Sequence, residues 1–389
     1  MKFEFYNPTR VFFGAGMISR LGIEAKKIGK KAFLVIGKGS VKKHGILDKA
    51  IKSLEGAGVD FLLFEGIEPN PRLGTVLRAK EALIKSGADM VIGLGGGSVM
   101  DASKVIATLP FYQGDPWDMM RVGTRAQRLP TKALPIITVP TLAATGSEMN
   151  EGAVITNEET CEKAYVGAEC MFPRIAIVDP ELTLTVPKDH TAYGLADIIA
   201  HVTESYFNTK VNTPIQDSMA EGIVRTVIEY GRRVVEDLND LEARAQIQWA
   251  SVVALNRWVQ CGTDAPFPVH QIEHVLSGHH DIPHGAGLAI VTPAWMRFAL
   301  PHNRNKFKQF AKKVFGICGE NAEIRGIDAL ENFFKEVGCP TRLREVGIDP
   351  SRFERFAQDA VRIGGDGEKV YGIPPLRVAD IVEILRRCA

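Results

Sequence analysis

Five of the nine histidines lie in one short stretch, VHQIEHVLSGHHDIPHG, residues 269–285. His270 and His274 are four residues apart, so on a helix they share one face. His284 follows Pro283, and we expect it beyond that helix, on a bend that could fold back. Imidazole nitrogens are common ligands of Fe²⁺ and Zn²⁺. The cluster therefore indicates a metal site, provided that other ligands exist elsewhere in the chain.

A second pair of ligand-type residues lies upstream, in GLADIIAHVTESYF, where Asp197 and His201 are again four residues apart. One aspartate and three histidines would make a site for Fe²⁺ or Zn²⁺, with a coordination position left for substrate. A single histidine on an apolar helix face is more often a packed core residue. Four ligand-type residues in one helical region favour the metal interpretation. His279 and His280 are interpreted as loop or cleft-rim residues without an assigned role.

The segment MVIGLGGGSVMDASK, residues 90–104, has the pattern of a buried strand, a glycine-rich turn and a helix start. Glycines 95–97 would let the backbone approach a pyrophosphate, whose charge is stabilised at a helix N-terminus. Serine at position 98 departs from G-x-G-x-x-G, and alone the pattern is equally typical of a tight turn. Two further small-residue loops, at 35–45 and 138–150, follow strands of the same expected sheet. Together the three loops indicate a nucleotide-binding cleft.

Position 37 bears on which nicotinamide nucleotide this cleft prefers. A carboxylate at the end of that strand would bond the adenosine ribose hydroxyls and repel a 2′-phosphate. The chain has Gly37 there, followed by Lys38, with Lys42 and Lys43 nearby. Lysines at a helix start are commonly only solvated, but the missing carboxylate removes the usual reason for excluding NADP. NAD stays open, and the sequence leans toward NADP(H).

Histidine pairs four residues apart also occur in metalloproteases, whose H-E-x-x-H motif places glutamate directly after the first histidine. In HQIEH, Glu273 directly precedes the second histidine instead. It therefore points off the face shared by His270 and His274 and could not act as base toward a metal-activated water. A protease is disfavoured, and a purely regulatory nucleotide-binding protein has no use for an open metal site. A metal-dependent hydrolase stays open as an alternative, distinguished by whether activity requires a nicotinamide cofactor. A metal beside a nucleotide cleft suggests dehydrogenation of an alcohol.

Composition excludes several partner classes. The 389 residues carry 47 lysines and arginines against 46 acidic residues, without a long block of one sign, so nucleic-acid and membrane-surface roles lack electrostatic support. The six cysteines are scattered, as is typical of reduced thiols. The N-terminus lacks an apolar signal segment, and no apolar run reaches the roughly 18 residues of a membrane span. We expect a cytoplasmic protein with neither nucleic-acid nor membrane partners.

The elements that would position these residues follow two different patterns, one in each half of the chain. As far as about residue 180, short apolar runs alternate with amphipathic segments, which predicts βαβ units and a parallel sheet. The expected strands are 32–37, 60–66, 90–95, 134–140 and 174–180. After Pro187, apolar residues recur with helical spacing to the C-terminus. We predict an α/β dinucleotide-binding domain at 1–183 and an all-α metal-binding and catalytic domain at 184–389.

Four motifs together resemble the iron-containing (group III) alcohol dehydrogenases: GGGSVMDASK, TVPTLAATGSEMN, the D-x-x-x-H of ADIIAHVTESYF and the spaced histidines of HQIEHVLSGHHDIPH. The likeness extends from NPTRVFFGAG through EPNP (68–71) to AIVTPAWM (289–296), and it is nearest to the butanol dehydrogenase branch. The family implies a dehydroquinate synthase-like fold, with an α/β nucleotide-binding domain, an all-helical metal domain and the active site between them. It also implies a homodimer.

Carried over by position, the resemblance implies the metal ligands Asp197, His201, His270 and His284, with Fe²⁺ the expected metal and Zn²⁺ an alternative. His274 would be a nearby histidine that does not ligate, and a candidate for catalytic proton relay. The expected cofactor-binding residues are Gly37, Gly39, Ser40, Asn70, Gly95, Gly96, Gly97, Ser98, Asp101, Thr138, Thr141 and Lys163. The chain departs from the family in reading DAPFPVH where relatives often carry a tryptophan, and in having His280 where they often carry an aromatic residue. Both departures leave the substrate size open.

The activity that the resemblance implies is the metal-dependent, NAD(P)-linked interconversion of small, butanol-like primary alcohols and their aldehydes by hydride transfer. The cation would act as a Lewis acid on the substrate oxygen, and the nicotinamide would carry the redox chemistry. A glycerol dehydrogenase or a lyase of the dehydroquinate synthase type on the same fold is the alternative. The preferred alcohol and the physiological direction stay open.

Overall fold

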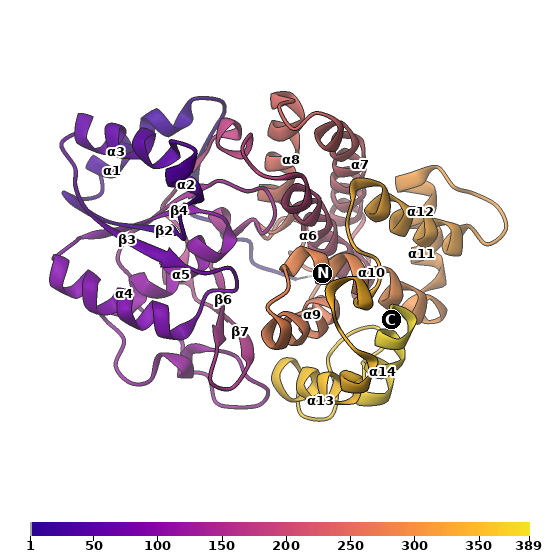
Figure 1. The fold of residues 1–389 in the computed structure, drawn as a ribbon. Coiled ribbons are helices and arrows are strands. Elements are labelled where there is room, and N and C mark those ends of the chain that lie inside the picture. Colours follow the sequence, from indigo (N-terminus) through magenta and orange to yellow (C-terminus); the bar gives the residue numbers. More distant parts are fainter. Residues whose placement is uncertain (1) are drawn as a thin grey trace. The chain divides into compact units, whose positions relative to one another are not determined.

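The computed structural model describes residues 2–389, which form two compact units (Figure 1). One unit consists of Asn7–Arg121 and Arg125–Val186, and the other contains Pro187–Ala389 together with Val122–Thr124 and the residues before Asn7. The first unit is built on a parallel sheet and the second is helical. This confirms the expected fold class. Among residues 2–389, no helix is both long enough and apolar enough to cross a bilayer.

The α/β unit contains a six-stranded parallel sheet in the order β1-β8-β5-β4-β2-β3. Its strands are β1 (Arg10–Phe13), β2 (Lys31–Gly37), β3 (Asp60–Ile67), β4 (Met90–Gly95), β5 (Ile136–Pro140) and β8 (Ile175–Val178). Its helices are α1 (Leu21–Lys26), α2 (Ser40–Lys43), α3 (Ile46–Gly56), α4 (Leu73–Ser86) and α5 (Gly97–Thr108). β4 and β5 are buried at every position, which explains their uninterrupted apolar sequences.

All five expected strands are present, with ends that differ by at most two residues. Sequence reasoning missed β1, a four-residue strand at the sheet edge, and the antiparallel hairpin of β6 (Gly152–Asn157) and β7 (Glu162–Gly167). Neither has the long apolar run that identifies a central parallel strand. The hairpin matters for the site because β6 contacts α5, where the backbone N–H of Val154 donates to Asp101.

The strand order reverses between β2 and β4. From β2 the chain continues to β3 on one side, then returns to β4 on the other side of β2. Ile36 pairs with Leu94, so the carboxyl ends of β2 and β4 lie level with each other. Ligands of open α/β sheets bind at such a reversal. The loops that begin at Gly37 and Gly95 are therefore placed where a nucleotide site is expected.

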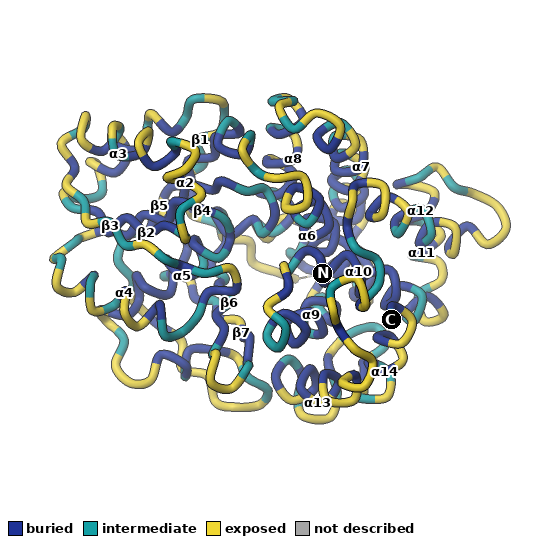
Figure 2. Tube along the Cα trace, in the orientation of Figure 1, coloured by how far each residue is buried: buried dark blue, intermediate teal, exposed yellow. Residues whose placement is uncertain are grey.

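The helical unit contains the nine longer helices of the described chain after Val186. They are α6 (Lys188–Phe207), α7 (Pro214–Glu236), α8 (Leu241–Ala254), α9 (Pro268–His280), α10 (His284–Ala299), α11 (Arg304–Phe315), α12 (Ala322–Val337), α13 (Phe353–Gly364) and α14 (Val378–Arg387). α6 is buried from Gly194 to Phe207 and α10 from Gly285 to Met296, so both are core helices (Figure 2).

The junction between α9 and α10 differs from expectation. His279 and His280 form the last turn of α9 rather than a loop, and His284 is the first residue of α10 rather than part of a bend. Only three residues, Asp281–Pro283, connect the two helices, and Asp281 adopts a left-handed conformation with φ of 52°. Pro283 directly precedes the first residue of α10, and the fixed φ angle of proline suits the start of a helix.

α10 packs very closely against α6 next to His284. A Cβ atom at Gly285 would lie 2.1 Å from the backbone carbonyl oxygen of Tyr193 on α6. A backbone atom cannot move aside cheaply, so glycine is what allows the two helices to approach here.

We predict that Gly285→Ala lowers the free energy of unfolding by about 1–3 kcal/mol, because the added methyl group must separate α10 from α6. Gly222→Ala on α7 is the matched control, since its Cβ would meet only a flexible Arg225 side chain at 3.8 Å. The control should stabilise the protein by about 0.5–1 kcal/mol. Urea denaturation followed by circular dichroism measures both. Equal stability of Gly285→Ala and wild type would contradict this account of the helix contact.

Candidate metal and nucleotide sites

The four expected metal ligands come together inside the helical unit. Asp197 and His201 lie one turn apart on α6, His270 lies in the first turn of α9 and His284 begins α10. Asp197, His201 and His270 are only 2%, 5% and 7% exposed, and His284 is partly exposed. Residues far apart in the sequence therefore meet in one largely buried place.

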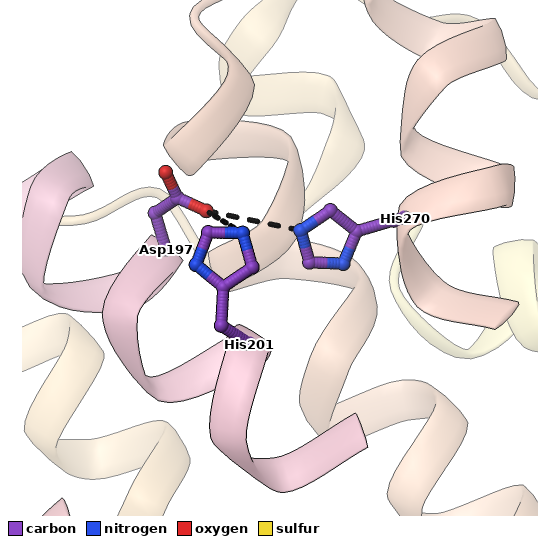
Figure 3. A group of neighbouring side chains, drawn as sticks. All are labelled: Asp197, His201 and His270. Carbon is purple, nitrogen blue, oxygen red and sulfur yellow. Dashed lines mark ion pairs between the residues drawn. The ribbon is translucent and has the colours of Figure 1, made fainter. Parts of the chain in front are cut away.

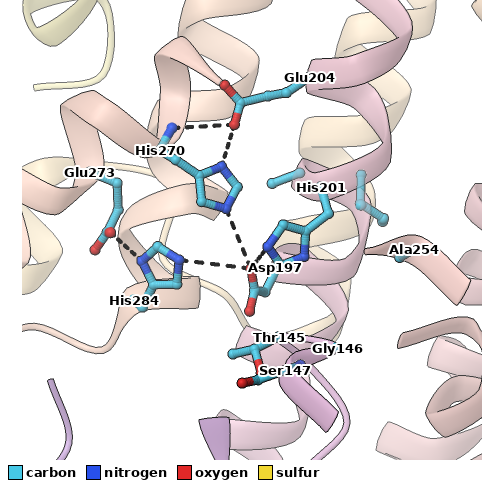
Figure 4. Close-up of polar contacts among 12 residues, drawn as sticks. Thr145, Gly146, Ser147, Asp197, His201, Glu204, Ala254, His270, Glu273 and His284 are labelled. Carbon is cyan, nitrogen blue, oxygen red and sulfur yellow. Dashed lines mark hydrogen bonds and ion pairs between the residues drawn. The ribbon is translucent and has the colours of Figure 1, made fainter. Parts of the chain in front are cut away.

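The donor atoms converge on a single carboxylate oxygen. Asp197 Oδ1 lies 3.4 Å from His201 Nε2, 3.8 Å from His270 Nε2 and 3.8 Å from His284 Nε2 (Figures 3 and 4). Ligand bonds of about 2.0–2.1 Å in a tetrahedral site place neighbouring donor atoms about 3.4 Å apart. These three distances are thus close to the donor spacing of a divalent metal centre. One ligand atom each of Asp197, His201 and His270 also lies within 4.8 Å of the other two.

The same atoms lack other partners. Asp197 Oδ1 and His270 Nε2 are buried and make no hydrogen bond to any described residue. Buried polar atoms are normally paired, so two facing atoms left over at one point indicate a ligand. Asp/His₃ is a donor set suited to Fe²⁺ or Zn²⁺. The residues present therefore fit the metal that the resemblance implies.

Burial and charge act differently on the ligands. Burial favours the neutral imidazole of His201 and lowers its pKa to about 3. For Asp197, burial opposes ionisation, but the neighbouring His201 and His270 outweigh it and hold the pKa well below its usual value. His270 is buried as well, yet the negative charges of Glu204 and Asp197 and its contact with Glu204 raise its pKa to about 10. The centre is a buried carboxylate surrounded by imidazoles.

Two buried glutamates, which sequence reasoning did not include in the site, contact the far nitrogens of these histidines. Glu204 on α6 lies against Nδ1 of His270, and Glu273 on α9 lies against Nδ1 of His284 (Figure 4). Both glutamate side chains are fully buried. The sequence held a signal for Glu204, which follows Asp197 by seven residues and therefore shares its helix face.

His274 lies beside the ligand set without being part of the convergence on Asp197. It is 6% exposed, and its ring centroid lies 5.5 Å from that of His284 and 6.2 Å from that of His270. A second group of ligand-type residues lies here, in which one atom from each residue is within 4.8 Å of the others: Glu273, His274 and His284. A position next to the centre agrees with the expected relay residue, whose role stays a prediction.

The two remaining histidines of the cluster have packing contacts. His279 Nε2 lies 3.0 Å from Asp359 Oδ2 on α13, and His280 Nε2 lies 3.3 Å from an Arg352 guanidinium nitrogen. Both rings also contact Phe356. They join the end of α9 to α13 rather than forming a loop or cleft rim.

In the α/β unit, the glycine-rich turn precedes α5 as expected. A Cβ atom at Gly97 would lie 2.4 Å from Thr145 Cγ2, so this glycine is needed for the packing of the following loop. At Gly96, a Cβ atom would meet only Leu142, at 3.7 Å. Nothing in the protein itself therefore requires glycine at position 96. Close approach of a ligand to the backbone at this helix start is a reason for it.

Asp101 and Lys104, on the first turns of α5, hold the neighbouring loop together. Asp101 accepts hydrogen bonds from Ser147 Oγ at 2.6 Å and from the backbone N–H of Val154 at 2.8 Å. Lys104 is completely buried, and its ammonium donates to Ser147, Asn150 and the carbonyl oxygen of Gly152. Burial lowers the pKa of Lys104 to about 8. Asp101 thus positions the loop through both oxygens, whereas we had expected it to contact the cofactor.

The other expected cofactor residues differ in their contacts and in how far they are exposed. Lys163 on β7 donates to Asn70 Oδ1 at 2.9 Å, so these two distant residues do form one group. Thr141 is 8% exposed at the end of β5, beside the carbonyl oxygen of Gly95, which accepts its backbone N–H. Thr138 has no exposed surface, and its hydroxyl donates to Glu148 O at 3.3 Å. The side chain lies within the sheet, and its part in cofactor binding stays a prediction.

Comparisons with known proteins agree with both halves of the chain. The family model of the iron-containing alcohol dehydrogenases matches residues 8–180, and that of the Fe-containing alcohol dehydrogenase family C-terminal region matches 191–389. The chain is 42% identical to NADH-dependent butanol dehydrogenase A of Clostridium acetobutylicum, over 100% of this chain and 99% of that protein. It is 36% identical to the NADPH-dependent aldehyde reductase YqhD of Escherichia coli, over 90% of each chain.

Comparison with a solved structure also places the chain among the butanol dehydrogenases in fold. The crystal structure of NADH-dependent butanol dehydrogenase A from Thermotoga maritima superimposes with a TM-score of 0.94 at 39% identity, covering 100% of this chain and 98% of that one. Sequence likeness and fold likeness thus both extend over the full length. The chain therefore belongs to the iron-containing alcohol dehydrogenase family, on its butanol dehydrogenase-like branch.

Proposed function

We propose that the protein is a metal-dependent, NAD(P)-linked alcohol dehydrogenase and aldehyde reductase that interconverts small, butanol-like primary alcohols and aldehydes. The observation that carries the proposal is the convergence of three histidine Nε2 atoms on Asp197 Oδ1, in a chain of this family. Relatives named butanol dehydrogenase and aldehyde reductase support the substrate class. They do not favour the glycerol dehydrogenase or dehydroquinate synthase alternative.

Asp197, His201, His270 and His284 would hold the divalent metal, with Fe²⁺ expected from the family and Zn²⁺ compatible with the same donors. When bound, the metal would supply Lewis acidity for the oxygen of an alcohol or aldehyde. The surrounding helices keep the ligands in a low-dielectric interior, which strengthens every charge interaction there. His274, beside the centre, is proposed to move the substrate hydroxyl proton through its imidazole nitrogens.

For the nucleotide, we propose residues at the strand reversal and the loops around it, within a dinucleotide-binding domain of residues 1–183. The remainder, 184–389, would be the metal-binding and catalytic domain. The N-terminus of α5 favours the negative charge of a pyrophosphate, and Gly96 leaves its backbone accessible. The proposed cofactor-binding residues are Gly37, Gly39, Ser40, Asn70, Gly95, Gly96, Gly97, Ser98, Asp101, Thr138, Thr141 and Lys163.

We predict that His270→Ala loses bound metal together with butyraldehyde reduction, because one of the four ligand atoms is removed. His302→Ala, at an exposed histidine outside the site, is the control and should keep both. Metal content by inductively coupled plasma spectrometry and the NAD(P)H absorbance assay measure the two properties on metal-stripped protein reloaded with Fe²⁺ or Zn²⁺. Normal turnover by His270→Ala would refute the metal assignment.

The preference between NAD and NADP depends on the end of β2. We propose that the protein prefers NADP(H), because no carboxylate follows this strand and Lys38, Lys42 and Lys43 lie nearby. Lys42 forms an ion pair with Glu65 on β3, which offsets part of that positive charge. An exposed pair of this kind is weak and is screened by salt. The relatives divide, since the butanol dehydrogenase named above is NADH-dependent and YqhD is NADPH-dependent.

We predict that Gly37→Asp shifts the preference toward NAD(H). A Cβ atom at Gly37 would meet only Ile67 O at 3.4 Å and Val99 Cγ2 at 3.6 Å, so the structure accepts the side chain. A like-charge repulsion of about 1–4 kcal/mol corresponds to a fall of at least about fivefold in kcat/KM for NADPH. Steady-state kinetics with both nucleotides measure it, and Gly56→Asp, at the exposed end of α3, is the control. If the ratio of kcat/KM for NADPH to kcat/KM for NADH is unchanged in Gly37→Asp, position 37 does not determine the cofactor preference.

We also propose that the protein is a cytoplasmic homodimer. β1 is an edge strand of the sheet, and Phe13 at its end is 38% exposed. In the helical unit, Phe3 and Phe5 are 50% and 40% exposed. Exposed apolar side chains and sheet edges favour association of copies. Multi-angle light scattering should give twice the chain mass of 42.6 kDa, and a mass of 42.6 kDa would exclude the dimer.

A further inference from the structure

Glu204 connects the helix that carries Asp197 and His201 to the helix that carries His270. Its Oε1 accepts the backbone N–H of Val269 at 2.5 Å, and its Oε2 accepts that of His270 at 3.3 Å. The same Oε2 contacts His270 Nδ1. One fully buried side chain of α6 thus satisfies free N–H groups at the start of α9 and holds the imidazole ring of a ligand.

Glu273 makes the corresponding connection between α9 and α10. Its Oε2 contacts Nδ1 of His284, the first residue of α10, and its side chain is fully buried. α10 leaves room for this carboxylate at Gly287, where a Cβ atom would lie 2.7 Å from Glu273 Cγ. The space for Glu273 is therefore provided by a glycine of α10.

These contacts determine which imidazole nitrogen carries the hydrogen. An ionised carboxylate can only accept hydrogen bonds, so Nδ1 of each contacted histidine must be the donor. In the neutral ring the lone pair then lies on Nε2, which is the atom that faces Asp197 Oδ1 in both His270 and His284 (Figure 4). His201 has no such contact, since its Nδ1 is buried without a hydrogen-bond partner in residues 2–389.

We propose that Glu204 and Glu273 are positioning residues that direct the Nε2 lone pairs of His270 and His284 into the metal centre and thereby increase its affinity for a divalent cation. The inference rests on the proposed metal centre and assigns two residues to it that hold no metal themselves. Carboxylates that accept from the far nitrogen of a ligating histidine orient the ring and increase its basicity.

Glutamine substitution separates this role from a purely structural one. In Glu204→Gln the amide oxygen keeps the Val269 N–H bond, so the NH₂ group faces His270 Nδ1. Because that group donates, it favours the tautomer with hydrogen on Nε2, whose lone pair points away from the centre. Size, burial and the Val269 bond of the helix cap are retained, whereas the acceptor that faces His270 Nδ1 is replaced by a donor. Glu273→Gln removes the carboxylate charge next to His284 Nδ1 without involving a helix cap.

The experiment measures the affinity of metal-stripped protein for Co²⁺, by competition with a chromophoric chelator, and the thermal midpoint of the same metal-free samples. Glu221→Gln is the matched control. Glu221 is 5% exposed in the same unit, and it accepts from Tyr206 and Gln309 rather than from a histidine. We expect Glu204→Gln and Glu273→Gln to bind Co²⁺ about 10–100-fold more weakly than wild type. Their metal-free thermal midpoints and the Co²⁺ affinity of Glu221→Gln should stay unchanged.

Wild-type affinity in both variants at positions 204 and 273 would overturn the inference while leaving the metal centre intact. An equal loss in Glu221→Gln, or a loss matched by a lower metal-free thermal midpoint, would reduce the two glutamates to structural residues. If the wild-type protein itself fails to bind Co²⁺, the proposed metal centre is wrong, and the inference about the two glutamates is then wrong as well.

Discussion

The helical unit is organised around a negative charge in its interior. Asp197 lies on a helix that is buried over most of its length, where an unpaired carboxylate would cost several kcal/mol. That cost is acceptable only if positive charge reaches the same place, and the proposed divalent cation, held between Asp197 and three imidazoles, would supply it. The close packing of α6, α9 and α10 can be understood from this requirement, because each helix must bring a nitrogen atom to within a few ångströms of one oxygen.

The α/β unit meets a different requirement, that of receiving an anionic ligand on its backbone. Its glycines are not equivalent in this respect, since position 97 is constrained by the protein's own loop and position 96 is not. The buried ammonium of Lys104 fixes the loop that follows β5, so the small residues near α5 are held by a polar network rather than by apolar packing. Such a network is specific because every member must be satisfied.

Much of the fold and of the metal ligand set could be anticipated from sequence, for identifiable reasons. The central strands are apolar throughout and the ligand pair on α6 has helical spacing, so local pattern alone places them. Glu204 and Glu273 were not assigned to the site because their histidine partners lie on other helices, and spacing within one helix does not reveal such a contact. Asp101 and Thr138 were assigned to the cofactor because their loop motif is typical of nucleotide sites, and sequence alone did not reveal that both also make bonds within the protein.

The short Asp281–Pro283 connection has a consequence for how the centre is assembled in the cell. Asp197 and His201 come together as soon as α6 forms, because they are neighbours on one helix. His270 and His284 reach them only after α9 and α10 have folded back on each other and docked, and three linking residues allow those two helices few alternative arrangements. The proposed cation site is therefore complete only once these helices have docked. A chain in which only α6 has formed would offer a cation two of the four proposed ligands.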